Sequence, residues 1–538
     1  MAADDADLLR ADGSKVQVGD RVAHDEYVGT VKYIGSVPPT KGVWLGVEWD
    51  DPSRGKHNGC HEGVKYFETS HPTSGSFVRP KKVDLGVDCL FAIKDRYGKQ
   101  EEGVAGVDMD ELYVLSADNK ATVVEMVGAE KINKKQSQLN LLVEVSLRGM
   151  NIYGIQPEVQ LSDITPNVHD LDLSRNLIAS WDMVARICRQ LPHLQKLYLS
   201  ENRLASPEDP QELSKAFTTV ISLSLNKMSL TWEKLLQIFS MFQNVEKLYI
   251  CDNGLQTLSD PQGDLQHLTM LSLELNHISK WEEILKLGRL GQLETLVLAD
   301  NGVESIYFPD VPHGQKTQLF PKLRQLYLQG NRLSDWSSFD EMNKLQSLEE
   351  LLFGSLPHLG EMETVRETII AKIARLSRCN RTLVEEQERK GAEIDYLKRY
   401  GPAWLKAGGN QDLAKSSPSP EFVAQHPRFQ ELVEKWGAPE TSEMKQQTKS
   451  LKDSLITLKF HAPQRPDVAI FEKKLPSTMT VAKLRTLVQR LYQLDGDFVL
   501  SYISQKMKGP EIEFDNDLRQ MSFFSVESGD TIQVKWCT

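Results

Sequence analysis

The clearest pattern along the chain is a recurring arrangement of apolar positions, apolar-x-x-Leu-x-Leu-x-x-Asn-x-apolar. Complete copies begin at Val168, Leu194, Val245, Leu268, Leu293 and Leu323. Degenerate copies begin at Leu142, Val220 and Leu348. Successive starts are separated by 26, 26, 26, 25, 23, 25, 30 and 25 residues. The two Leu positions of each copy are two residues apart, so both side chains face one side of a short strand.

This pattern resembles the leucine-rich repeat family. Stacked copies bury a continuous apolar core, so we expect a curved α/β solenoid with a concave parallel sheet over residues 142–357, in about nine repeats. The recurring Asn is expected to bond backbone groups of neighbouring turns as a ladder. Trp181, Trp281 and Trp336 each follow the Asn of their repeat by five residues and are expected to fill the core on the return side.

Residues between the two Leu positions face the opposite side of each strand. Tyr198, Tyr249 and Tyr327 occupy such places and are expected to point outward on the concave face. Exposed tyrosines there favour a protein-binding surface, and the alternative is a bare scaffold with scattered aromatics.

The regions that flank the repeats are less regular. Val365, Ile369, Ile373 and Leu376 recur with helical spacing, which predicts a helical cap over residues 358–405. Residues 406–454 contain Gly and Ser-Pro breakers and are interpreted as a linker with a short helix near 421–436. Residues 86–141 are interpreted as a connecting segment in which alternation around Tyr113, Leu115 and residues 122–124 indicates strands.

The N-terminal residues 10–85 carry a different pattern. Seven glycines between positions 29 and 63 are interleaved with large aromatic residues, which predicts a small all-β barrel with tight turns. The loop Gly55-Lys56-His57-Asn58-Gly59 is expected to present exposed N–H groups beside an aromatic floor, an arrangement that suits capture of a C-terminal carboxylate. The alternative is that the glycines only shape the barrel and the surface binds nothing.

This segment resembles the CAP-Gly family, whose Gly-Lys-Asn-Asp-Gly loop binds the acidic, aromatic-ended C-terminal tails of tubulin and end-binding proteins. The match departs from the family at His57 and Asn58, and His57 donates a hydrogen bond without the geometry of an amide. The resemblance implies that the residues binding the α-tubulin tail are Trp44, Trp49, Gly55, Lys56, His57, Asn58, Gly59, Lys65, Phe67, Phe77 and Arg79.

The last residues, 455–538, predict a compact α+β domain. Alternation over 455–460 indicates a strand, and further strands are expected near 468–471, 498–503 and 531–536. Thr480 is expected to cap a helix whose apolar face is Val481, Leu484, Val488 and Leu491. The segment resembles the ubiquitin-like β-grasp fold. It ends without Gly-Gly, so we expect a domain that docks on a protein rather than a conjugated modifier; the alternative is a domain that only adds stability.

Composition narrows the class of function. The chain of 538 residues has a net charge of −12, which disfavours nonspecific binding to nucleic acid. Lys56, Lys65, Arg79, Lys81 and Lys82 form a local basic group near the glycine-rich loop, as an acidic peptide ligand requires. No apolar run is long enough for a membrane span, and the acidic N-terminus does not resemble a signal peptide, so no membrane partner is expected.

The six cysteines are scattered without a Cys-x-x-Cys pair, a pattern typical of reduced thiols in the cytosol. Phosphate-binding, zinc-protease and serine-hydrolase signatures are missing from the sequence. We therefore expect no enzyme, no catalytic residue, no metal site and no cofactor.

The order of CAP-Gly domain, leucine-rich repeats and ubiquitin-like domain resembles the tubulin-folding cofactor E family. The resemblance implies a chaperone of the cytoplasm and cytoskeleton that binds α-tubulin, assists assembly and dissociation of the α/β-tubulin dimer, and so regulates microtubules. It implies the other tubulin-folding cofactors B, C and D as partners. The alternative function is a microtubule adaptor that recruits a partner through the repeats; the lack of coiled-coil heptads disfavours it.

Overall fold

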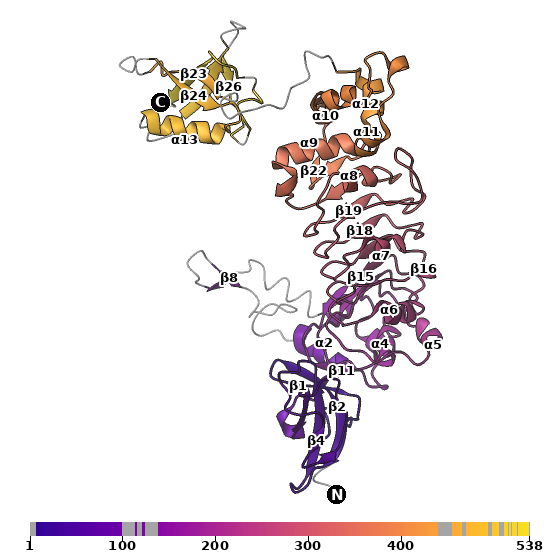
Figure 1. The fold of residues 1–538 in the computed structure, drawn as a ribbon. Helices are drawn as coiled ribbons and strands as arrows, with labels where there is room; N and C mark the ends of the chain where they lie inside the picture. The colour runs from indigo at the N-terminus through magenta and orange to yellow at the C-terminus, as the bar shows by residue number, and fades with distance from the viewer. Residues whose placement is uncertain are drawn as a thin grey trace. The chain divides into compact units, whose positions relative to one another are not determined.

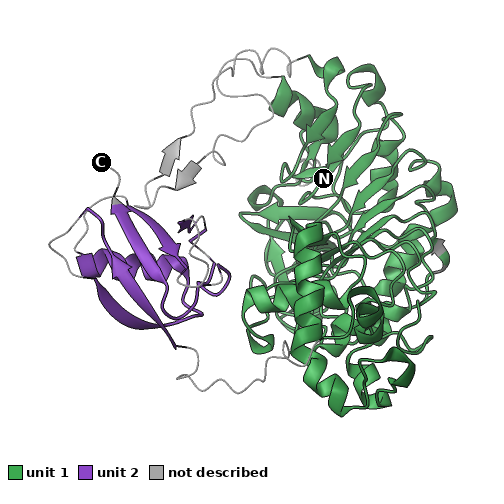
Figure 2. Ribbon diagram, turned by 90° about the horizontal axis from the view of Figure 1, so that it is seen from above, with its two compact units in different colours: residues 1–441 green, residues 442–538 purple. Residues whose placement is uncertain are grey.

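The computed structural model describes residues 7–98, 113–115, 121–123, 138–439, 455–464, 470–492, 498–504, 511–514, 516–517, 519–524 and 526–536. The chain divides into two compact units, residues 1–441 and residues 442–538 (Figure 2). The first unit contains the N-terminal domain, the solenoid and a helical cap, and the second unit is the C-terminal domain.

The N-terminal domain is built on an antiparallel sheet with the strand order β1-β2-β3-β6. Its strands are β1 (Arg21–His24), β2 (Tyr27–Ser36), β3 (Val43–Trp49) and β6 (Gly75–Val78), with a hairpin of β4 (Cys60–His61) and β5 (Val64–Lys65) and a 3-10 turn η1 (Pro80–Lys82). The inward-facing core consists of Leu8, Val16, Val22, Val31, Leu45, Val47 and Trp49. The expected small all-β domain is confirmed.

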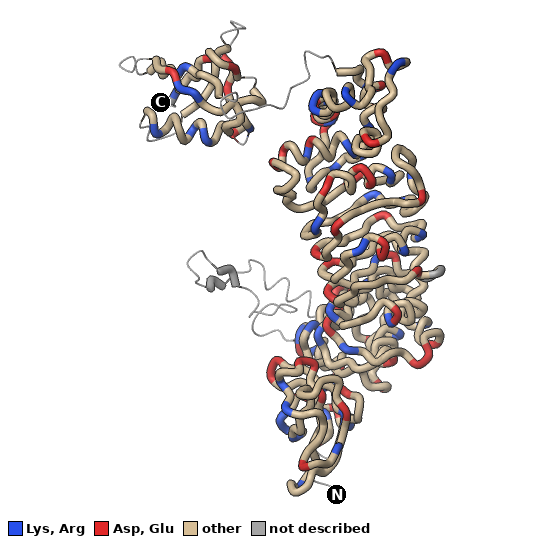
Figure 3. The backbone as a smooth tube through the Cα atoms, in the orientation of Figure 1, with Lys and Arg blue, Asp and Glu red and all other residues tan. Residues whose placement is uncertain are grey.

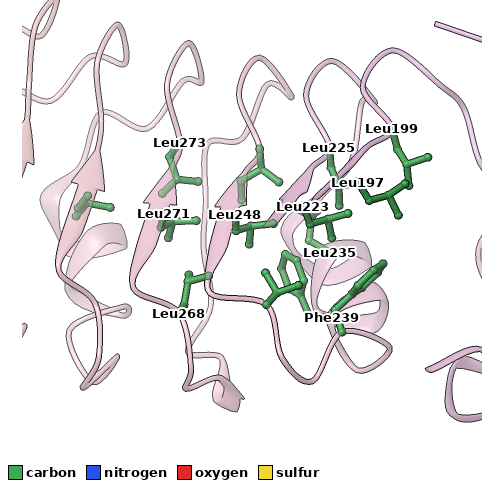
Figure 4. Packing of buried hydrophobic residues seen from close by; sticks show 14 of the residues in the cluster. Leu197, Leu199, Leu223, Leu225, Leu235, Phe239, Leu248, Leu268, Leu271 and Leu273 are labelled. Carbon is green, nitrogen blue, oxygen red and sulfur yellow. The ribbon is translucent and has the colours of Figure 1, made fainter. Parts of the chain in front are cut away.

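The solenoid carries a long sheet whose strands follow one another in chain order and pair in parallel until the last pair (Figure 1). The strands are β10 (Glu144–Ser146), β12 (Asp170–Asp172), β13 (Lys196–Tyr198), β14 (Ser222–Ser224), β15 (Lys247–Tyr249), β17 (Met270–Ser272), β18 (Thr295–Val297), β19 (Gln325–Tyr327), β20 (Glu350–Leu352), β21 (Arg378–Cys379) and the antiparallel β22 (Thr382–Leu383). Figure 4 shows that Leu197, Leu223, Leu248 and Leu271 form one buried row across successive strands. The predicted repeat array is confirmed.

The Asn ladder forms where each repeat leaves its strand. Asn202 is fully buried; its Nδ2 donates to the carbonyls of Leu173 and Leu199, each at 2.9 Å. Its Oδ1 accepts from the N–H of Asn176, the ladder residue of the preceding repeat, at 3.0 Å. The residue before each ladder Asn has positive φ, for example Glu201 at 61°. The side-chain bonds therefore replace the backbone bonds that the turn cannot make.

The return side of the solenoid carries short helices, 3-10 turns and a short strand. They are η3 (Leu139–Leu141), η4 (Leu161–Asp163), α4 (Trp181–Cys188), α5 (Pro210–Ser214), α6 (Trp232–Phe239), the strand β16 (Gln262–Leu265), α7 (Trp281–Leu285), α8 (Ser337–Met342) and η5 (Pro357–Leu359). Trp181 and Trp281 are buried in the core as expected. Trp336 packs against the same core but is only half-buried.

The solenoid begins earlier than its sequence pattern indicates. The strand β7 (Val87–Asp88) pairs in parallel with β11 (Ile152–Gly154), and the helix α2 (Cys89–Tyr97) buries one face in the solenoid core. The interpretation of residues 86–98 as a connecting segment is therefore wrong: an open solenoid end exposes apolar core, which α2 covers. The expected strands within the segment are confirmed as the hairpin β8 (Tyr113–Leu115) and β9 (Ala121–Val123), and Val124 lies outside the described residues.

The solenoid also ends later than residue 357. The predicted cap helix is α9 (Met362–Lys372), followed by β21 and β22, which extend the concave sheet to residue 383. Val365, Ile369, Ile373 and Leu376 are buried as the helical spacing predicts. The short strand β21 escaped the pattern because its repeat carries Cys379 and Arg381 in place of the Leu-x-Leu pair.

The predicted linker over 406–454 is wrong for residues 406–439. They fold back on α10 (Glu386–Lys406) as η6 (Leu413–Lys415), α11 (Pro420–Gln425) and α12 (Phe429–Trp436). The buried residues of this helical cap include Tyr396, Trp404, Phe422, Phe429 and Leu432. The breakers Gly408 and Ser419 shape turns between packed helices, and residues 440–454 lie outside the described residues.

Acid is expected to weaken the helical cap through His426. The Tyr396 hydroxyl and His426 Nδ1 share a hydrogen bond of 2.6 Å, and burial, followed by the charge of Lys372, lowers the pKa of His426 from 6.5 to about 4. The unfolded chain binds a proton that the folded cap excludes, so stability falls as the pH drops from about 6.5 to about 4. One pKa unit is about 1.4 kcal/mol and the ring is part exposed, so we expect a loss of about 2 kcal/mol.

Denaturant unfolding of the wild type and of His426→Gln across this pH range measures the effect. Glutamine keeps an acceptor for the Tyr396 hydroxyl but does not titrate, so the variant's stability is expected to change less with pH. Identical pH profiles for the two proteins would assign the acid sensitivity to other groups.

The C-terminal domain is a β-grasp with the strand order β24-β23-β27-β25-β26, in which β23 and β27 are parallel. Its elements are β23 (Leu455–His461), β24 (Phe471–Pro476), α13 (Val481–Tyr492), β25 (Phe498–Ile503), β26 (Ile512–Glu513) and β27 (Thr531–Trp536). Thr480 Oγ1 accepts from the N–H of Lys483, which confirms the expected cap. The second strand was predicted near 468–471, and the structure places it at 471–476.

Candidate functional site

The N-terminal sheet separates an inner core from an outer aromatic face. Along β3, Leu45, Val47 and Trp49 point into the core, whereas Trp44 and Gly46 face outward. Trp49 is 1% exposed, so the expectation that it contacts a bound tail is wrong. The reason is strand alternation: Trp44 and Trp49 are an odd number of residues apart and therefore lie on opposite faces.

The outer face holds an aromatic cluster centred on Phe77, whose members are Tyr33, His57, His61, Tyr66, Phe67 and Phe77. The Phe77 ring centroid lies 5.1 Å from His57, 5.3 Å from Tyr66 and 5.4 Å from Phe67. Phe67 is 6% exposed and forms the floor. The other members are part exposed, so they offer ring surfaces to a ligand.

The glycines beside this cluster are required by close packing. A Cβ on Gly46 would lie 2.5 Å from the Phe67 ring, and one on Gly59, whose φ is +89°, would lie 2.0 Å from the Phe67 carbonyl. A Cβ on Gly55 would lie 2.0 Å from the carbonyl of Thr73. A larger residue would therefore displace the buried Phe67 ring at position 46 and the backbone at positions 55 and 59.

The loop over residues 55–59 is fastened through its own backbone. The N–H groups of Lys56 and His57 both donate to the Gly75 carbonyl, at 2.7 and 3.1 Å, and the Gly75 N–H donates to the His57 carbonyl at 2.7 Å. The expectation that these N–H groups face a ligand is therefore wrong, because they bond to β6. A carboxylate at this loop is therefore not met by the N–H groups of Lys56 and His57, whereas the side chains of Lys56 and Asn58 are exposed beside it.

His57 is held as a neutral hydrogen-bond donor. Its Nδ1 accepts from the Gly59 N–H at 3.0 Å. Burial lowers the pKa of His57, and electrostatic interactions with His61 and Lys56 lower it further. A neutral ring that accepts at Nδ1 carries its proton on Nε2, so the free edge of His57 can donate to a carboxylate.

The basic residues near the aromatic cluster differ in how accessible they are to a bound carboxylate. Lys56 and Asn58 are exposed at the loop tip. Lys65 is exposed but pairs with Glu68 at 3.0 Å. The part-exposed Arg79 guanidinium stacks on the Trp44 ring at 3.9 Å and donates to the carbonyls of Lys41 and Val43, so these contacts fix its position beside Trp44.

Three members of the cluster, Tyr33, Tyr66 and His61, were not predicted as site residues from the sequence. Tyr33 on β2 pairs opposite Gly46 of β3, beside Phe77 of β6. Strand alternation could have found Tyr33 once the three strands were placed side by side. Tyr66 and His61 lie in or beside the β4–β5 hairpin, whose fold back over the sheet has no signal in the spacing of residues.

The tyrosines expected on the concave face of the solenoid lie in one row. The strand register places Tyr198, Tyr249 and Tyr327 at equivalent positions, with Ser224 between the first two and Ser272 and Val297 between the last two. All three tyrosines are part exposed. Since strands are about 4.8 Å apart, the row spans about 24 Å from Tyr198 to Tyr327.

Charge along the solenoid is mixed rather than segregated. Figure 3 shows acidic and basic residues interspersed along its turns. Beside the tyrosine row, Lys196 pairs with Asp170 at 2.7 Å and Arg324 pairs with Glu349 at 2.7 Å. The concave face is therefore a polar sheet with an aromatic row, which suits a folded protein surface better than a nucleic acid.

Two further properties concern the residues that the structure describes. Among them, no group of three His, Cys, Asp or Glu side chains is arranged to hold a metal ion. Within the same ranges, none of the helices has the length and apolar character needed to cross a bilayer.

The CAP-Gly domain model matches residues 18–83. Tubulin-specific chaperone E of Danio rerio is 44% identical over 524 residues, covering 96% of this chain and 99% of the relative. The protein of the same name from Homo sapiens is 41% identical and covers 99% of this chain and 100% of the relative. The solution structure of the C-terminal ubiquitin-like domain of mouse tubulin-specific chaperone E is 41% identical, covers 17% of this chain and 96% of that domain, and has a TM-score of 0.16.

Proposed function

Because the chain belongs to the tubulin-specific chaperone E family, we propose that it binds α-tubulin and assists assembly and dissociation of the α/β-tubulin dimer. The observation that carries the tail-binding part is the part-exposed aromatic cluster beside Lys56 and the free edge of His57. An aromatic C-terminal residue would lie on the rings of Tyr33, Tyr66 and Phe77. Its carboxylate would meet the Lys56 ammonium and His57 Nε2–H.

Tail capture does not by itself separate the dimer. The tail of α-tubulin is exposed in the free subunit and in the dimer, and a ligand with equal affinity for both states shifts no equilibrium. If the dimer is held at nanomolar strength, its separation requires on the order of 12 kcal/mol of compensating contact or strain. We propose that the tyrosine row of the solenoid and the ubiquitin-like domain supply this contact.

The remaining partners and the location follow from the same family. We propose that the chain works in the cytoplasm and at the cytoskeleton with tubulin-folding cofactors B, C and D. The family and the fold support binding without catalysis.

One experiment separates this proposal from the adaptor alternative. The full chain is mixed with purified α/β-tubulin, and native mass spectrometry counts the surviving species. A chaperone lowers the amount of intact dimer and yields a complex with a single tubulin subunit. An adaptor leaves the dimer intact, and that result would overturn the proposal.

Replacing Lys56 by alanine is expected to weaken binding of a peptide ending in Glu-Glu-Tyr by about 1–2 kcal/mol. A charge contact at about 4 Å is worth roughly 4 kcal/mol at an effective dielectric near 20, before screening and desolvation. Calorimetry measures the affinity. Lys94→Ala on α2 removes the same charge outside the aromatic cluster and should leave it unchanged. Equal affinities of the wild type, Lys56→Ala and Lys94→Ala for the peptide would show that Lys56 does not bind the carboxylate.

Changing Tyr198, Tyr249 and Tyr327 together to serine is expected to slow action on whole tubulin about tenfold, since aromatic anchors contribute strongly when a partner desolvates them. The part-exposed rings lie outside the core, so the melting transition and tail-peptide affinity should be preserved. Native mass spectrometry of the dimer checks the prediction. Full activity of the triple variant would show that the tubulin contact does not lie on the concave face.

A further inference from the structure

The CAP-Gly domain is joined to the solenoid without a flexible linker. Its last residues run directly into β7, which pairs with β11 of the first repeat, and the Val87 N–H donates to the Asn151 carbonyl at 2.9 Å. Asn151 Nδ2 also donates to Asp84 Oδ2 at 2.7 Å. Figure 1 shows the N-terminal strands directly beside β11 and α2. The connection is therefore part of the folded structure.

A second contact is made by Tyr153 in β11. The buried Arg10 guanidinium of the CAP-Gly domain lies over its ring at 4.0 Å. The Tyr153 hydroxyl donates to Asp12 Oδ2 at 2.5 Å and lies 3.3 Å from Ser14 Oγ. Burial and the Asp12 carboxylate raise the pKa of Tyr153, so the hydroxyl remains a donor at neutral pH.

A third contact joins the domain to the third repeat through Asp50, which directly follows β3. Its carboxylate binds Arg21 of the same domain through two nitrogens. Arg203, which follows the ladder residue Asn202 of the solenoid, approaches Asp50 Oδ1 at 3.2 Å and the Asp50 carbonyl at 3.4 Å. One carboxylate therefore connects an arginine from each domain at the end of the strand that carries Trp44 and Gly46.

We infer that Tyr153 and Arg203 are positioning residues that hold the aromatic cluster at a fixed orientation to the solenoid. The tail site and the solenoid then form one rigid, two-part surface for a single folded tubulin subunit. The inference rests on the proposed function and adds how the two contact sites are arranged. Tyr153 and Arg203 do not contact tubulin themselves; they fix the orientation of the CAP-Gly domain that does.

Rigidity changes the energetics of a two-part contact. When the first part has bound, the second binds at an effective concentration that depends on how well the connection matches the partner's geometry. A fixed connection avoids the loss of orientational freedom that a flexible linker would suffer on binding. It also restricts strong binding to partners whose tail and body have the matching separation.

The first measurement tests the rigidity itself. Spin labels are introduced through non-natural amino acids at the exposed Glu26 of the CAP-Gly domain and Lys280 of the solenoid in the full chain. We expect one narrow distance distribution in the wild type and a broad one in the Arg203→Ala/Tyr153→Ala double variant. A broad distribution in the wild type would overturn the inference.

The second measurement compares two ligands. Calorimetry with a peptide ending in Glu-Glu-Tyr should give the same affinity for the wild type and the double variant, because neither residue belongs to the aromatic cluster. Affinity for whole α/β-tubulin is expected to fall about tenfold or more in the double variant. Arg203→Lys, which keeps the charge beside Asp50, should retain most of the affinity.

Matched variants exclude simpler explanations. Arg332 follows the ladder residue Asn331 as Arg203 follows Asn202, and Arg332→Ala should leave both affinities unchanged. Tyr153→Phe removes the hydroxyl, and with it the bonds to Asp12 and Ser14, from a ring that remains packed under Arg10, and its affinity for tubulin should be intermediate.

The outcomes distinguish this inference from the proposed function. Unchanged affinity for whole tubulin in a double variant with a broadened distance distribution would overturn the inference and leave tail binding intact. If the wild type binds tubulin but not the peptide, the proposed tail site is wrong, and the two-part surface is wrong as well.

Discussion

Replacing Asn276 by alanine is expected to destabilise the solenoid by about 4 kcal/mol, because it leaves several buried backbone groups without partners. Asn276 is 1% exposed. Its Nδ2 donates to the carbonyls of Ile250 and Leu273 at 3.0 and 2.9 Å. Its Oδ1 accepts from the N–H groups of Asn253 and Leu255 at 3.0 and 3.1 Å. Each buried group left unpaired costs about 1–3 kcal/mol, and alanine offers no replacement.

Hydrogen exchange at Asn253 and Leu255 measures this loss locally, which avoids assuming two-state unfolding of a multidomain chain. A loss of about 4 kcal/mol corresponds to exchange about a thousandfold faster where exchange follows local opening. Asn244 is the matched control: it is exposed and donates to the Thr218 carbonyl at 2.8 Å, so Asn244→Ala should change stability by less than about 1 kcal/mol. Equal effects of the two substitutions would contradict the ladder role of Asn276.

Replacing Phe77 by alanine is expected to weaken tail-peptide binding about a hundredfold, the loss typical of a central aromatic anchor. The Phe77 ring contacts Tyr33, His57, His61, Tyr66 and Phe67, so its removal takes away ligand surface and loosens the neighbouring rings. Phe77→Leu keeps apolar volume without an aromatic face and should lose less. Calorimetry with the Glu-Glu-Tyr peptide measures both.

The control for Phe77 lies in the ubiquitin-like domain. Phe523 is 60% exposed, and Phe523→Ala should leave peptide affinity unchanged. Circular dichroism checks that the Phe77 variants retain the CAP-Gly fold, since Phe67 loses a packing neighbour at 5.4 Å. Peptide affinity that survives Phe77→Ala in a folded domain would place the tail elsewhere on the chain.

Strand alternation explains where prediction of the candidate site succeeded and where it failed. It correctly predicted the outward row of Tyr198, Tyr249 and Tyr327, since the flanking Leu positions define which face is buried. The same rule, applied to β3, separates Trp44 from Trp49, but family resemblance assigned both to one site. Family resemblance indicates which residue types belong to a site. Whether a given strand residue can reach the site depends on which face of the sheet its side chain takes, and residues an odd number of positions apart take opposite faces.

The sequence by itself determined the parts that depend on local periodicity. The repeats, the Asn ladder, the capped helix α13 and the glycines of the tail loop follow from spacing, because neighbouring residues decide which face a side chain takes. Tertiary structure alone decided what depends on distant partners. The helices α2 and α10–α12 cover the ends of the solenoid, and the amides of Lys56 and His57 bond to Gly75. Asp50 likewise contacts Arg203. Each of these contacts joins segments that are distant in the sequence, so no local pattern encodes them.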